Sequence, residues 1–107
     1  MSAANIERAK RFIEENMEKP LSLAEVSRES GMSRYHFSRI FKAYTGMTFK
    51  TYHNARRIDA AKKLLQKPEN RISEVCYAVG YNDLSYFNRV FRRYTGMSPS
   101  LFRKQFR

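Results

Sequence analysis

A direct internal repeat constrains the fold of this chain more than any other feature of its sequence. The segment GMSRYHFSRIFKAYTGMT, from Gly31 to Thr48, returns as GYNDLSYFNRVFRRYTGMS from Gly80 to Ser98. Residues up to the glycines align at an offset of 49, and residues from Phe37 onward at an offset of 50. Two copies are too few for a stacked solenoid. We therefore expect two similar lobes within a chain of 107 residues.

Apolar residues are spaced as in α-helices along almost the whole chain, and no stretch alternates with the period of a strand. An amphipathic helix is predicted from Ile6 to Met17, and Pro20 is expected to end it. Ser22, with Glu25 three residues later, has the capping-box pattern that begins a helix. The sequence predicts an all-α fold of seven helices.

Each copy of the repeat reads as a short helix, a turn with glycine and a second helix, which is the helix-turn-helix plan. The glycine lets the first helix end in a left-handed conformation. We expect one domain over residues 1–107, with the first helix-turn-helix at 22–45 and the second at 71–95. A long linker helix at 48–66 joins these two lobes, and a last helix follows at 98–105.

The repeated apolar positions are expected to form the cores of the lobes. Ser27 and Cys76, four residues before the repeated glycines, should lie where two helices cross closely and only a small side chain fits. Leu101 and Phe102 are expected to close the core from the last helix. The second helices should turn the following residues inward: Phe37, Ile40, Phe41 and Tyr44 in the first copy, and Phe87, Val90, Phe91 and Tyr94 in the second.

Positive charge is concentrated in the part of the chain that contains the repeat. Residues 1–30 hold five Lys/Arg and six Asp/Glu, whereas residues 31–107 hold sixteen and four, and the whole chain has a net charge of +11. Such a surface favours a polyanionic partner, with nucleic acid ahead of an anionic membrane. The first turns of a recognition helix are the part that reaches base edges in the major groove of duplex DNA.

The second copy resembles the DNA-binding domain of the AraC/XylS transcription regulators. GYNDLSYFNRVFRRYTGMSPSLFRK matches the long signature of this family, and ARRIDAAKKLL, residues 55–65, matches its linking helix. The resemblance covers roughly residues 5–107. It implies two helix-turn-helix lobes that read adjacent major grooves of double-stranded DNA, in a cytoplasmic bacterial transcription regulator.

The resemblance also assigns roles to the exposed positions of the second helices. It implies base contacts from Tyr35, Ser38 and Arg39 in the first lobe and from Leu84, Ser85, Asn88 and Arg89 in the second. Leu84 is apolar and can meet a thymine methyl group. The other exposed positions are assigned to the DNA backbone: Arg34, His36, Lys42, Tyr86, Arg92 and Arg93.

The chain departs from the family pattern at a few positions of compatible size. Phe49 stands where the family often has proline, and Phe37 where leucine is more usual. Ser27 and Cys76 replace a common alanine. These substitutions leave the expected fold unchanged.

Other classes of function find less support. No catalytic constellation, cofactor motif or metal-ligand spacing is present, since His36 and His53 lie on different predicted helices without a partner cysteine or carboxylate. The lone Cys76 is interpreted as a packing residue and not as a redox sensor. A second hypothesis is a module that docks a protein such as RNA polymerase. No membrane segment is expected, and the isolated domain is expected to be a monomer.

Overall fold

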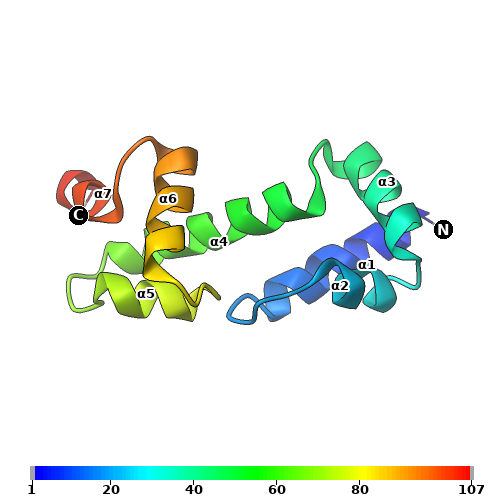
Figure 1. Cartoon of the computed structure of the whole chain (residues 1–107), viewed down its shortest axis with the longest axis horizontal. Coiled ribbons are helices and arrows are strands. Elements are labelled where there is room, and N and C mark those ends of the chain that lie inside the picture. Colours follow the sequence, from blue (N-terminus) through cyan, green and yellow to red (C-terminus); the bar gives the residue numbers. More distant parts are fainter. Residues whose placement is uncertain (1, 107) are drawn as a thin grey trace. The chain divides into compact units, whose positions relative to one another are not determined.

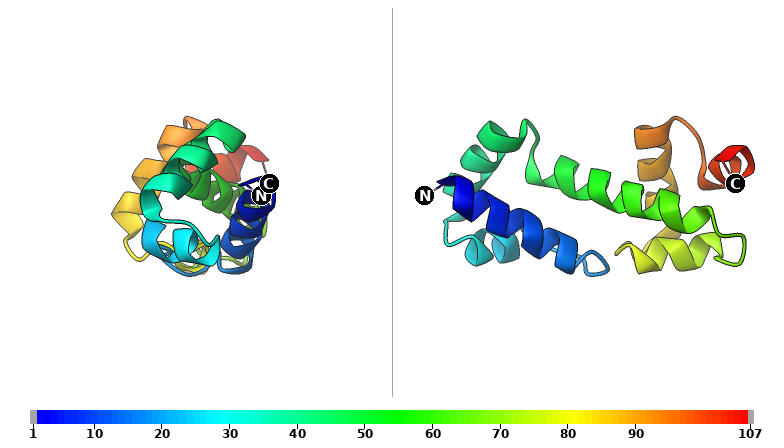
Figure 2. Two further views of the ribbon diagram at one scale, coloured as in Figure 1. Left: turned by 90° about the vertical axis from the view of Figure 1, so that its right-hand side faces the viewer. Right: turned by 180° about the vertical axis from the view of Figure 1, so that it is seen from behind.

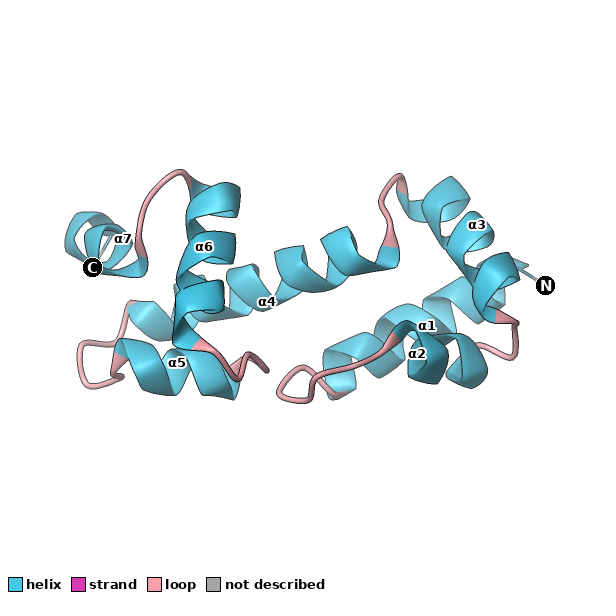
Figure 3. Ribbon diagram, in the orientation of Figure 1, coloured by secondary structure: helices cyan, strands magenta, loops and turns pink. Residues whose placement is uncertain are grey.

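The computed structural model describes residues 2–106, and within that range the chain forms seven α-helices and no strand (Figures 1 and 3). The predicted all-α fold, with two helix-turn-helix lobes and a long linker helix, is confirmed. The helices are α1 Ser2–Glu15, α2 Leu23–Glu29, α3 Arg34–Thr45, α4 Phe49–Leu65, α5 Ile72–Ala78, α6 Leu84–Thr95 and α7 Pro99–Phe106. No helix within the described range is long and apolar enough to cross a bilayer.

The chain packs into two units, Met1–His53 and Asn54–Arg107, and the junction between them falls inside α4 (Figures 1 and 2). The first unit contains α1, α2, α3 and the first residues of α4. Its buried core consists of Ile6, Ala9, Ile13, Val26, Phe37 and Phe41. Phe49 and Tyr52, at the start of α4, pack against this core.

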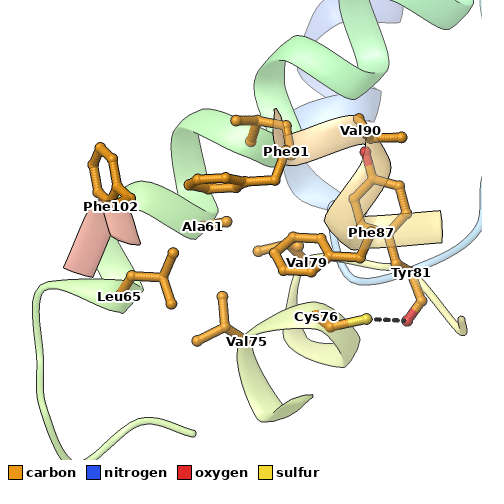
Figure 4. Close-up of a cluster of buried hydrophobic side chains, with 11 residues drawn as sticks. Ala61, Leu65, Val75, Cys76, Val79, Tyr81, Phe87, Val90, Phe91 and Phe102 are labelled. Atoms are coloured by element: carbon orange, nitrogen blue, oxygen red, sulfur yellow. Dashed lines mark hydrogen bonds between the residues drawn. The ribbon is translucent and has the colours of Figure 1, made fainter. Parts of the chain in front are cut away.

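The second unit contains the rest of α4 with α5, α6 and α7. Its core is formed by Ile58, Ala61, Leu65, Val75, Cys76, Val79, Tyr81, Phe87, Val90, Phe91 and Phe102 (Figure 4). Side chains from all four helices of the unit meet in this cluster. The small Cys76 is fully buried, as its predicted place at a helix crossing requires.

The repeat extends further than the aligned sequences alone indicate. Tyr52 packs edge-on against Phe41 at 5.3 Å and 78°, and Phe102 packs against Phe91 at 5.5 Å and 78°. The start of α4 therefore closes the first core as α7 closes the second. The residues of α1 that enter the first core match in spacing those of α4 that enter the second: Ile6, Ala9 and Ile13, and Ile58, Ala61 and Leu65. Each unit is thus a copy of one four-helix plan, and α4 serves in both.

The helices begin at side chains that accept their free amides. At α2, Glu25 N donates to Ser22 Oγ (3.1 Å) and Ser22 N donates to Glu25 Oε1 (3.0 Å), which confirms the capping box. These bonds hold the pKa of Glu25 below its usual range. In the second copy only half of the box remains, where Arg71 N donates to Glu74 Oε1 (3.0 Å).

The turn of each helix-turn-helix contains a glycine with positive φ, 78° at Gly31 and 99° at Gly80. Any other residue would be strained in this left-handed region. Apart from the glycine itself and the residues on either side of it, no atom lies within 4 Å of a Cβ built on Gly31. The backbone conformation, and not a lack of space, is therefore what requires glycine at that position.

Three details of the sequence interpretation are corrected. Helix α1 ends at Glu15, before Pro20, and Asn16 Nδ2 donates to Phe12 O (2.8 Å) in the turn that follows. Tyr44 is not inward: it is 57% exposed, because Phe49 and Tyr52 already cover the core below the end of α3. Leu101 is 44% exposed, since its neighbour Phe102 points into the core and successive helix residues face different sides.

Candidate nucleic-acid interface

One face of helix α3 packs against the first core, and the opposite face is open to solvent. Ser33 caps it, since His36 N donates to Ser33 Oγ (3.2 Å). Phe37 and Phe41 are fully buried and fix the helix against the first core. The opposite face forms an open groove lined by Tyr35, Ser38, Arg39, Lys42, Ala43 and Thr48. All three residues predicted to read bases from the first lobe line this groove.

An arginine and a tyrosine meet on the exposed face of α3. The Cζ atom of Arg39 lies 5.7 Å from the ring centroid of Tyr35, at cation–π distance. Tyr35 is 73% exposed, so this pair is open to solvent. Exposed aromatic and guanidinium groups side by side can contact both base edges and phosphates.

Helix α6 repeats this arrangement in the second unit. Asp83 caps it and accepts bonds from Ser85 N (2.9 Å) and Tyr86 N (3.3 Å). Phe87, Val90 and Phe91 hold its inner face. Its outer face forms a groove with α7, lined by Ile72, Leu84, Ser85, Asn88, Arg89, Arg92, Arg93, Ser98, Pro99 and Ser100.

Most of the predicted contact residues are brought together in these two grooves, and three are not. Arg34 and His36 are exposed at the start of α3 but do not line its groove. Tyr86 is half-buried and packs against the second core, with its ring centroid 5.8 Å from that of Tyr81. Its ring therefore lies between the core and the surface.

The grooves also contain residues that the sequence analysis did not assign to DNA contacts. Thr48 and Ser98 occupy equivalent positions of the repeat, and each caps the helix that follows. Thr51 N donates to Thr48 Oγ1 (3.2 Å) and Leu101 N donates to Ser98 Oγ (3.2 Å). A hydroxyl residue stands at this position in both copies of the repeat, and this shared feature could have indicated from the sequence that Thr48 and Ser98 belong to the grooves.

The two grooves have the same sign of charge. Every ionisable side chain apart from tyrosine that lines them is basic: Arg39, Lys42, Arg89, Arg92 and Arg93. Such a surface attracts phosphates and repels acidic partners. The hydroxyl groups of Ser38 and Ser85 and the amide of Asn88, which can donate and accept hydrogen bonds, lie among these cations.

Other reactive groups lie outside the grooves. Cys76 is buried, and its burial together with the nearby Asp83 raises the pKa of the thiol. A thiol of this kind is a poor nucleophile. Within residues 2–106 there is no group of three or more His, Cys, Asp or Glu side chains that could hold a metal ion.

Known proteins share both the sequence and the fold. Residues 26–105 match a family described as a helix-turn-helix domain. The regulatory protein PocR of Salmonella typhimurium is 30% identical over 102 residues, which cover 95% of this chain and 34% of PocR. This chain thus spans about a third of that relative.

Two solved structures show the same architecture. A transcriptional regulator from Chromobacterium violaceum, described as having an AraC-type DNA-binding domain, superposes with a TM-score of 0.88 at 29% identity, covering 97% of this chain and 93% of its own. The DNA-binding domain of AdpA, crystallised with a target DNA, has a TM-score of 0.91 over 95% and 92% of the chains, and at 24% identity it shows the shared fold. The chain belongs to the AraC-type helix-turn-helix family, the DNA-binding domains of transcription regulators.

Proposed function

We propose that this chain binds specific sites in double-stranded DNA, with α3 and α6 in two adjacent major grooves. The observation that carries the proposal is the duplicated groove on the second helix of each helix-turn-helix, basic in both copies. A charged helix face in a single helix is usually only solvated. The exposed faces of α3 and α6 follow the same turn in both copies, and we infer that they serve the same function.

Within this proposal the side chains divide by their chemistry. Arg39 and Arg89 occupy the same place in the two copies and can bind O6 and N7 of guanine together. Asn88 is suited to adenine, and Leu84 to the methyl group of thymine. Hydroxyl contacts to base edges come from Ser38 and Ser85, and Tyr35 adds a base contact beside Arg39.

The remaining cations are assigned to phosphates. Lys42, Arg92 and Arg93 line the grooves toward the last turns of α3 and α6, where a helix in the major groove approaches the backbone. Arg34 and His36 are exposed at the start of α3 and are assigned to phosphates as well. If six to eight phosphates are neutralised, log affinity should fall with log salt at a slope of roughly −5 to −7.

The test begins with duplexes selected by the protein from a random pool. We expect Arg39→Ala and Arg89→Ala each to weaken the selected duplex by about 1–3 kcal/mol and random duplex far less. Arg11→Ala, an exposed arginine of α1 outside both grooves, is the matched control for the loss of one charge. Equal losses of affinity on both duplexes would show that the two arginines contact phosphates and not bases.

The spacing of the two sub-sites provides a separate test. The junction between the two units falls within helix α4 and not in a loop. We expect that inserting five base pairs between the sub-sites, a half turn of DNA, lowers affinity to that of a single lobe. Unchanged affinity on the longer duplex would show that the lobes bind as independently tethered readers.

A further inference from the structure

Two tyrosine rings flanked by two arginines form a line of contacts in the second unit, from the buried side of α4 to the groove of α6. The Arg57 guanidinium carbon lies 4.5 Å from the ring centroid of Tyr81. The ring of Tyr81 lies 5.8 Å from that of Tyr86, and Arg89 Cζ lies 5.7 Å from the ring centroid of Tyr86. Arg89 lines the groove. The line therefore connects the core to a residue of the proposed interface.

Tyr81, the buried ring of this line, is held in place by several contacts. Tyr81 is 4% exposed, and its hydroxyl donates to Asn54 Oδ1 at 2.5 Å. Its ring packs at 5.4 Å from that of Phe87, and Cys76 Sγ donates to its backbone carbonyl at 3.8 Å (Figure 4). Burial raises the pKa of Tyr81 to about 12, against the opposing effect of Arg57. The phenol is therefore neutral at ordinary pH and remains a donor.

The outer end of the line is the arginine that meets solvent. Tyr86 is half-buried between Tyr81 and the surface, so one part of its ring is held by the core. Arg89 is exposed and rests beside that ring. A long side chain that already lies against a fixed ring loses less rotamer freedom when it binds a partner.

The first copy lacks this support. Met32 and His36 stand at the positions that Tyr81 and Tyr86 occupy in the second copy. Arg39 instead lies 5.7 Å from the ring of Tyr35, which is largely in solvent. Both copies therefore pair an arginine with a tyrosine, but only the second pair is backed by a second buried ring.

We infer that Tyr81 and Tyr86 are positioning residues that hold the guanidinium of Arg89 ready for its base pair, and that this makes the second lobe the more stringent reader. The inference rests on the proposed DNA-binding function and concerns how selectivity is divided between the lobes. It predicts that replacing the base pair read by Arg89 costs more affinity than replacing the one read by Arg39.

The test uses Tyr86→Leu, which keeps an apolar side chain and removes the ring. Affinity is measured on the selected duplex, on the same duplex with the base pair facing Arg89 replaced, and on random duplex. We expect the preference for the selected over the replaced duplex to fall about threefold to tenfold, as loss of a cation–π contact implies. Binding to random duplex should fall by less than the preference does, because Tyr86→Leu removes no charge and at most one neutral contact to the DNA backbone.

Matched variants separate positioning from general damage. Tyr86→Phe keeps the ring and should retain the wild-type preference. Tyr77→Leu removes an exposed tyrosine of α5 that lines neither groove, and should change nothing. In an Arg89→Ala background, Tyr86→Leu should have no further effect on the preference. Should Tyr86→Leu fail to fold, Tyr86→Met also removes the ring, and its flexible apolar side chain adapts to the same space.

The results of these measurements distinguish failure of this inference from failure of the proposed function. Wild-type protein with no preference for any duplex would overturn the proposed function and this inference together. Wild-type selectivity that survives in Tyr86→Leu, or an equal loss on all three duplexes, would overturn the inference alone. So would an effect of Tyr86→Leu that persists without Arg89.

Discussion

Arg103 of α7 should be one of the most important residues for the stability of the second unit. Its Nε donates to Leu65 O at 2.9 Å, and its Nη2 donates to Lys67 O at 3.4 Å and to Asn70 O. Leu65 is the last residue of α4, and Lys67 and Asn70 lie in the turn before α5. One planar guanidinium thus joins α7 to the last carbonyl of α4 and to two carbonyls of the turn that follows it.

The magnitude follows from the number and kind of these bonds. A hydrogen bond from a charged donor contributes about 1.5–3 kcal/mol. Arg103 is half-buried, so water can replace part of what its removal leaves open. We therefore expect Arg103→Ala to lower the free energy of unfolding by about 2–4 kcal/mol. For a unit of this size, that corresponds to a fall in Tm of roughly 10 °C or more.

Urea unfolding followed by circular dichroism measures this effect. Arg103→Lys retains the positive charge near the end of α4 but cannot reach three carbonyls from one ammonium group, so it should recover less than half of the loss. Lys104→Ala, an exposed neighbour, is the control for loss of a charge in α7. A lysine variant as stable as the wild type would show that charge at the helix terminus acts alone. A loss below about 0.5 kcal/mol in Arg103→Ala would show that the three hydrogen bonds contribute little to stability.

Three further outcomes are expected. Asp83→Ala removes the acceptor of two amides at the start of α6 and should lower the free energy of unfolding by about 1 kcal/mol, measured in thermal or urea melts. Asp83→Asn keeps an acceptor oxygen and should cost much less. Equal losses of stability in the two variants would show that the negative charge of Asp83 matters and its hydrogen bonds do not. The raised pKa of Tyr81, about 12, means that its contribution to stability is complete below about pH 10, where the unfolded phenol begins to ionise, and is lost as pH rises toward 12. Unfolding measured across pH 10–12 should therefore show a steeper fall for the wild type than for Tyr81→Phe, by up to about 3 kcal/mol, and parallel curves would contradict this. Cys76→Ala should bind DNA as the wild type does with and without peroxide, because the thiol is buried and its pKa is raised; wild-type binding that peroxide abolishes, and that the variant retains, would revive a redox role.

Much of the fold could be predicted from the sequence because local rules agree with one another along this chain. The capping pattern of Ser22 and Glu25, the helical spacing around Phe37 and Phe41, and the glycine at 31 all specify a helix-turn-helix within some twenty-five residues. The repeat then requires the same structure a second time. These signals act over a few turns of chain, so they need no knowledge of distant contacts.

The candidate site could be predicted for a related reason. Once the inward residues of α3 and α6 are identified, the helical period places Ser38, Arg39, Asn88 and Arg89 on the opposite faces. Tyr86 marks the limit of this reasoning. The same period places it on the border between the two faces, and only the packing of Tyr81 against it decides that its ring turns toward the core.

Residue type and short-range spacing were enough to predict the helices, the capping box at Ser22, the two helix-turn-helix copies and the basic faces. The tertiary structure alone decided that α4 completes one core and begins another, that Tyr44 lies in solvent and that Arg103 binds the end of α4. Such contacts join residues far apart in the chain, as between Arg103 and Leu65. They depend on which surfaces remain free after the helices have packed, and no periodicity in the sequence records that.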